Sequence, residues 1–139
     1  LGVAHARLSP DALMPTVDDR ATGDAVVKAL SAVDGPVLSP FAPWLPVLAG
    51  KEPSWHLISL WDVSQHGDGP WPKSGKLVEA AFREHRWAGV ADSDRSLGYG
   101  VKGAYVRGPF LSGRGFLPKT GWRTRPTILM VPREAPSTP

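Results

Sequence analysis

The sequence contains no cysteine among its 139 residues. This absence excludes disulfide bridges, thiolate nucleophiles and zinc sites with cysteine ligands. The chain also has no run approaching the roughly 18 apolar residues that a membrane-spanning helix needs, and no basic-then-apolar signal region. A chain of this length can bury a hydrophobic core without disulfides or a metal. We therefore expect one soluble domain.

An initiator methionine is absent as well, because the chain opens at Leu1. A chain that begins without methionine is either a mature secreted protein or one piece of a larger protein, and we expect the second. Residues 1–15 are expected to form a lead-in segment, and residues 16–133 a single α/β domain. Residues 134–139 are rich in proline and are expected to form a frayed tail.

Acidic residues are missing from one long stretch. Residues 1–94 hold eight Lys or Arg and twelve Asp or Glu, whereas residues 95–133 hold eight Lys or Arg and no acid. Aromatic side chains are interleaved with these cations. Such a stretch suits single-stranded nucleic acid, anionic lipid headgroups or an anionic glycan or lipid phosphate, and it also suits an ordinary solvated loop. The residues that we select for anionic contacts are Arg107, Arg114, Arg123 and Arg125.

Apolar periodicity and capping signals divide the chain into helices and strands. The first helix starts at Thr16 or Asp18, either of which is a good N-cap, and ends before Asp34. Residues 55–63 fit a strand or a helix equally, and the stretch between Asp94 and the last strand reads as long and loop-rich. The other expected elements are a strand at 36–39, a short helix at 44–49, a helix at 73–86, and strands at 87–91 and 127–131.

Nearly continuous apolar strands separated by a helix are typical of a parallel sheet covered by helices. The sequence therefore predicts an α/β fold with a small three- to four-stranded, mostly parallel sheet flanked by helices, and a loop-rich C-terminal third. If the strands are parallel, the loops at 39–43 and 92–96 lie at the same edge of the sheet. That edge is where open α/β sheets usually bind ligands.

Several segments together carry a family resemblance, which spans roughly residues 15–133. They are Asp19-Arg20-Ala21-Thr22-Gly23-Asp24, Gly35-Pro36-Val37-Leu38-Ser39-Pro40, Trp44-Leu45, Ala49-Gly50-Lys51-Glu52-Pro53-Ser54-Trp55-His56, Trp61-Asp62 and Val131-Pro132-Arg133. This pattern resembles the soluble C-terminal region of polytopic glycosyltransferases of the GT-C class, the glycosyltransferase 39-like membrane proteins that use lipid-linked sugars.

The resemblance implies where the chemistry would lie. In that family a bundle of transmembrane helices precedes this region, and the catalytic acidic residue lies in a loop near the first of those helices. The sugar donor is usually a polyprenyl-phosphate sugar. The chain would then be an extracytoplasmic accessory domain on a bacterial cell membrane, packed on the membrane portion of its parent chain. It would contact the acceptor, a glycan or a lipid phosphate, with no catalytic residue, metal or cofactor of its own.

Aromatic and polar residues gather in one part of the resembling stretch. From it we select Trp44, Lys51, Trp55 and His56 as a candidate binding surface. His56 and Asp62 do not form a tight pair in either expected geometry. A helix would place them on different faces, and a strand would place them about 20 Å apart.

Other sequence motifs lack the flanking elements that their usual functions require. Residues 98–103 match G-x-G-x-x-G, but the expected strand ends several residues earlier and no acid follows before Glu134. His66 with Asp68 is a weaker candidate for a metal or for catalysis. Two alternatives to the accessory domain remain: a stand-alone basic nucleic-acid-binding module, and a small hydrolase that uses His56 or His66.

Overall fold

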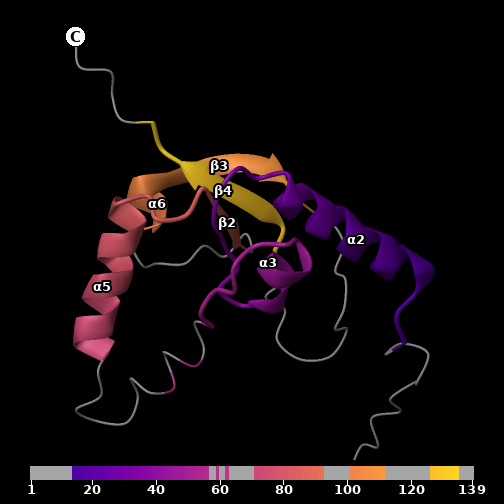
Figure 1. Ribbon diagram of the computed structural model, residues 1–139, viewed down its shortest axis with the longest axis horizontal. Coiled ribbons are helices and arrows are strands. Elements are labelled where there is room, and N and C mark those ends of the chain that lie inside the picture. The colour runs from indigo at the N-terminus through magenta and orange to yellow at the C-terminus, as the bar shows by residue number, and fades with distance from the viewer. Residues whose placement is uncertain are drawn as a thin grey trace, which may run out of the picture.

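The computed structural model describes residues 14–56, 59, 62, 71–92, 101–111 and 126–134. Helices lie on both sides of a central sheet (Figure 1). The elements in chain order are α2 (Val17–Ser31), β1 (Val37–Leu38), α3 (Trp44–Leu48), α5 (Trp71–Arg83), β2 (Gly89–Asp92), α6 (Val101–Ala104), β3 (Tyr105–Phe110) and β4 (Ile128–Pro132).

The first predicted helix is confirmed as α2, and a capping box explains where it begins. The backbone N–H of Asp19 donates to Thr16 Oγ1 at 3.1 Å, and the N–H of Thr16 donates to Asp19 Oδ2 at 2.8 Å. These bonds satisfy two of the N–H groups that a helix start leaves without partners. After α2 the chain turns at Gly35, whose φ of +114° favours glycine, and then enters β1.

The sheet has four strands in the order β1-β2-β4-β3. Strands β1 and β2 are parallel, with Val37 opposite Gly89 and Leu38 opposite Val90. Strand β4 lies between β2 and β3 and runs antiparallel to both. The α/β class and the four strands agree with the prediction, but the sheet is mixed.

The prediction of a mostly parallel sheet is wrong because β4 runs antiparallel to β2 and to β3. Strand β3 lies in the stretch that the sequence assigns to a loop. Gly108 and Pro109 interrupt its apolar pattern, and the pairing with β4 shifts between Arg107 and Phe110. A Cβ atom at Gly108 would lie 2.7 Å from the carbonyl oxygen of Leu129. Gly108 therefore makes the strand hard to predict from the sequence, yet it also allows the close pairing of β3 with β4.

The two faces of the sheet carry separate hydrophobic clusters, with α5 on the left and α2 on the right in Figure 1. Successive strand residues belong to different clusters, as the twofold periodicity of a strand requires. One cluster joins Val37, Ala91 and Leu129 to residues of α2 and α3, and the other joins Leu38, Val90 and Met130 to residues of α5 and α6. The described residues thus form three layers, with helices covering both faces of the sheet.

Candidate functional site

The carboxyl ends of β1 and β2 lie at one edge of the sheet, as the sequence predicts for parallel strands. Ser39 follows β1 and Asp92 ends β2, and each residue is only 1% exposed. Next to them, the N–H of Thr127 donates to the carbonyl oxygen of Asp92 at 2.8 Å. The Oγ1 atom of Thr127 is also buried and has no hydrogen-bond partner. The polar atoms of these side chains are therefore buried in the fold and do not face solvent.

Two of the four residues selected as a binding surface have structural partners. The Nζ atom of Lys51 donates to the carbonyl oxygen of Val33, just beyond the end of α2. A lysine suits this place because the C-terminal end of a helix carries partial negative charge. The ring of Trp55 lies edge-on to that of Trp87, with centroids 5.9 Å apart, and packs against the core.

The other two residues have more open positions. Trp44 begins α3 and is 47% exposed. His56 is partly buried, and its Nδ1 atom lies 3.2 Å from Ser59 Oγ. Among the described residues, Trp44 makes no hydrogen bond or ring contact with the other three. The shared binding surface remains a prediction, and the structure leaves Trp44 as its most exposed member.

The predicted anionic contacts fall mostly outside the described residues. Arg107 lies on β3, opposite Met130 of β4, and is exposed. Arg114, Arg123 and Arg125 lie outside the described ranges, as do His66 and Asp68. The prediction that the arginines share a ligand therefore stays a prediction.

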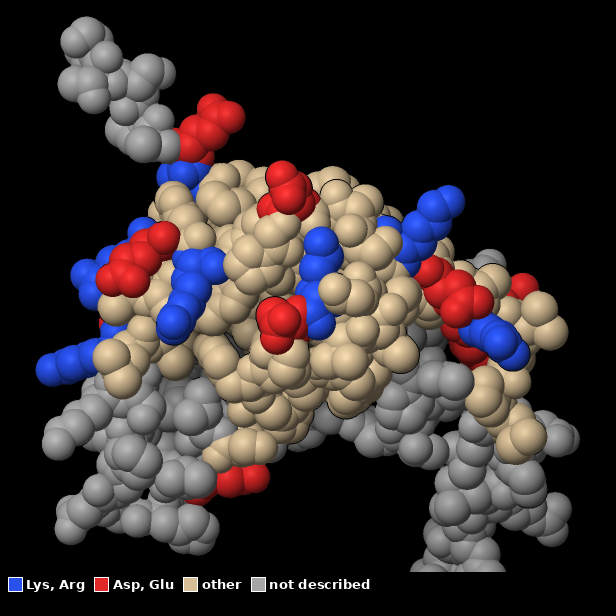
Figure 2. All heavy atoms as spheres, viewed as in Figure 1, with Lys and Arg blue, Asp and Glu red and all other residues tan. Residues whose placement is uncertain are grey.

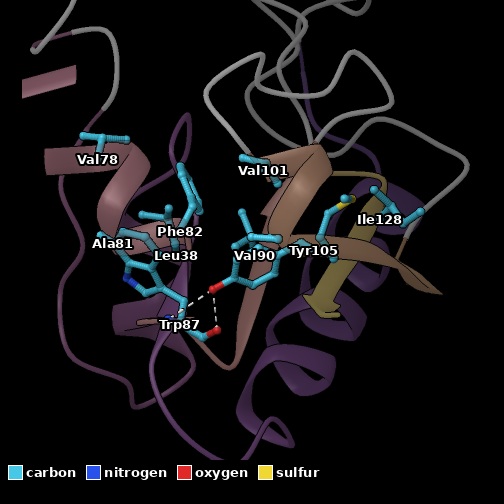
Figure 3. Packing of buried hydrophobic residues seen from close by; sticks show 11 residues of the cluster. Leu38, Val78, Ala81, Phe82, Trp87, Val90, Val101, Tyr105 and Ile128 are labelled. Atoms are coloured by element: carbon cyan, nitrogen blue, oxygen red, sulfur yellow. Dashed lines mark hydrogen bonds between the residues drawn. The ribbon is translucent and has the colours of Figure 1, made fainter. Parts of the chain in front are cut away.

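Trp87 and His85, which follow α5, form hydrogen bonds and ring contacts with Tyr105 of β3 and its neighbour Ala104 (Figure 3). No sequence motif indicates this group. The hydroxyl of Tyr105 donates to the carbonyl oxygen of Trp87 at 2.8 Å and accepts from the N–H of Trp87 at 3.3 Å. His85 lies beside this pair. Its Nε2 atom donates to the carbonyl oxygen of Ala104 at 2.9 Å, and its ring is edge-on to Tyr105. Because a carbonyl oxygen only accepts, this bond requires a proton on Nε2.

Burial raises the pKa of Tyr105, and its hydrogen bond to the backbone of Trp87 opposes that shift. A phenol held neutral and bonded to backbone groups stabilises the fold. The group therefore contributes to the packing of β3 against the segment that follows α5.

The chain matches no family model, no curated protein and no solved structure. The roles of its residues therefore rest on the geometry above. Within the described ranges, no three or more His, Asp or Glu side chains lie close enough together to hold a metal ion. The same ranges contain no helix that is both long and apolar enough to span a bilayer.

The glycine motif at residues 98–103 lacks the context of a dinucleotide-binding loop. Strand β2 ends at Asp92, and α6, which covers the last part of the motif, has only four residues. A pyrophosphate site needs a strand that leads tightly into a full helix, whose N-terminus binds the phosphates. Instead, α6 continues directly into β3.

Replacement of Lys51 by methionine is expected to lower the free energy of unfolding by about 1–2 kcal/mol. The variant keeps the apolar stem but removes the charged donor to Val33. Urea denaturation followed by circular dichroism measures the effect. The control is Lys76→Met, an exposed site on α5, where we expect less than about 0.5 kcal/mol. Equal losses at the two sites would show that the bond of Lys51 is energetically unimportant.

Proposed function

We propose that the chain is the extracytoplasmic accessory domain of a bacterial membrane glycosyltransferase that uses a polyprenyl-phosphate-linked sugar. In this role it packs on the membrane portion of its parent chain and contributes contacts to the acceptor glycan or to a lipid phosphate. It does not catalyse transfer alone.

One observation supports the proposal: several residues of the family-like pattern have structural roles in this fold. Gly35 and Gly50 both adopt positive φ, at +114° and +71°. A Cβ atom at Gly35 would also lie 3.0 Å from the Cβ of Ala88. Lys51 binds the carbonyl oxygen at the end of α2, and the Val37–Leu38 pair forms β1. A pattern built from such residues specifies a fold, which supports a resemblance of whole domains.

The use of the polar groups inside the fold supports a role without catalysis. Lys51, His85 and Tyr105 each donate to a backbone carbonyl group. A catalytic pair instead places two reactive side chains within hydrogen-bond reach of each other. His56 is paired with Ser59, but the contact is exposed, and within the described ranges no other hydrogen bond orients the imidazole. The third member that would hold a base in place is thus not found among the described residues.

The test compares the full parent protein, the parent without residues 16–133, and the 139-residue chain alone. Each is incubated with a polyprenyl-phosphate sugar in membranes that supply acceptors. We expect transfer by the full parent, a loss of at least about tenfold on deletion, and no transfer by the chain alone. Transfer by the isolated chain, or a parent without membrane spans before Leu1, would overturn the proposal.

Titration with single-stranded nucleic acid separates this proposal from the nucleic-acid alternative. Affinity that depends on phosphate contacts falls steeply with salt, because counterions are released on binding. For an accessory domain we expect weak binding at low salt and none at physiological salt. Sub-micromolar binding with a steep salt dependence would favour the basic nucleic-acid module.

A further inference from the structure

Helix α3 is apolar on all sides, but the fold covers only part of it. Leu45 and Pro46 are buried, and Leu45 packs in the cluster shared with α2. On the outer side, Trp44, Val47 and Leu48 are 47%, 51% and 64% exposed. These three residues, which we call the α3 face, have the i, i+3, i+4 spacing that places side chains next to one another on a helix. A helix that is apolar all round is normally covered on every side.

The chain segment that contains the α3 face has no charged residue. No Asp, Glu, Lys or Arg occurs from Pro36 to Gly50. The cation that follows, Lys51, is bonded to Val33 at the end of α2. In the space-filling view, the tan surface at the place of α3 is bordered by blue and red groups (Figure 2). The α3 face itself is apolar and uncharged, and it therefore suits an apolar partner.

The size of the α3 face selects among apolar partners. A stable dimer buries about 800 Å² on each partner, and three partly exposed side chains cannot supply that area. A shallow contact with a bilayer needs only a few apolar side chains, and tryptophan is enriched at the boundary between headgroups and acyl chains. From its composition, charge and size we infer that the α3 face inserts into the interfacial region of a lipid bilayer.

This inference rests on the proposed function, which supplies the membrane. The inference adds that the α3 face is the surface that contacts that membrane. The contact is hydrophobic, so it does not require anionic lipid. It differs in this respect from binding through the basic stretch 95–133, which salt would weaken. Salt dependence therefore reports which surface of the chain meets the lipid.

The experiment is co-flotation of the 139-residue chain with vesicles of phosphatidylcholine alone, at low and high salt. We expect binding that is unchanged by salt and that falls at least about tenfold in the variant Trp44→Ser/Val47→Ser/Leu48→Ser. The matched control is Leu77→Ser/Phe110→Ser, which replaces two apolar residues that are 71% and 69% exposed on other elements and should bind as the unaltered chain does. Circular dichroism checks that the variants fold, and Trp44→Ser alone gives a second, milder change.

Several results would overturn the inference. Among them are no binding by the unaltered chain, equal loss in the control, and binding that requires anionic lipid. Self-association in size-exclusion chromatography that Trp44→Ser abolishes would also overturn it, because a second copy would then cover the α3 face. Vesicle binding does not depend on sugar transfer. If the parent transfers sugar but the chain does not bind vesicles, only this inference is refuted. If the chain binds vesicles but its parent has no membrane spans, only the proposed function is refuted.

Discussion

Replacement of Phe82 by alanine is expected to lower the free energy of unfolding by about 3–5 kcal/mol. Phe82 is fully buried in α5, on the face of the helix that packs against the sheet. Its ring centroid lies 5.0 Å from that of Trp87 and 5.8 Å from that of Tyr105. Truncation removes both ring contacts and leaves a cavity among side chains that come from several elements (Figure 3).

Helix α5 provides a matched control for this change. Leu77 lies on the same helix but is 71% exposed, so Leu77→Ala is expected to cost less than about 0.5 kcal/mol. Urea unfolding followed by circular dichroism measures both variants. Because a loss of 3–5 kcal/mol approaches the whole stability of a small domain, Phe82→Leu provides a milder step that is expected to cost less than about 1.5 kcal/mol. Similar losses for Phe82→Ala and Leu77→Ala would contradict the placement of Phe82 in the core.

Helices α2, α3 and α5 were predictable because their signals are local, whereas α6 lies in the stretch that the sequence assigns to a loop. Thr16 and Asp19 are three residues apart and form the capping box within one turn, so the start of α2 can be read from the sequence alone. The predicted strand at 87–91 was less accurate, since β2 begins at Gly89. Trp87 lies outside the strand because its N–H and carbonyl groups bond to the hydroxyl of Tyr105. That partner is 18 residues away in sequence, and no local pattern indicates it.

The candidate site was predictable only as a place in the fold. Parallel pairing of β1 with β2 brings Ser39 and Asp92 to the same edge, which the order of elements suggests. The direction of individual side chains was not predictable in the same way. Lys51 and Trp55 lie in the same irregular segment, yet Lys51 reaches to Val33 and Trp55 to Trp87. Those directions depend on how α2 and α5 pack, which the sequence of the segment does not contain.

Replacement of Tyr105 by phenylalanine is expected to lower the free energy of unfolding by about 1–3 kcal/mol at neutral pH. The change keeps the ring in its packing against Phe82 and His85. It removes the hydroxyl, and the buried N–H and carbonyl groups of Trp87 then lose the partner that both share. Chemical denaturation at pH 7 measures the loss, and a change below about 0.5 kcal/mol would show that these groups find other partners.

The same variant tests the raised pKa of Tyr105 through the pH dependence of stability. Since burial raises this pKa above its usual value near 10, the folded state keeps the phenolic proton at a pH where the unfolded chain loses it. The stabilisation is complete below about pH 10 and is lost as pH rises toward the folded-state pKa. The difference in stability between the unaltered chain and Tyr105→Phe should therefore shrink between about pH 8 and about pH 11. Groups present in both proteins cancel in this difference, so a difference that is constant or grows over that range would contradict the burial of a neutral phenol at this position.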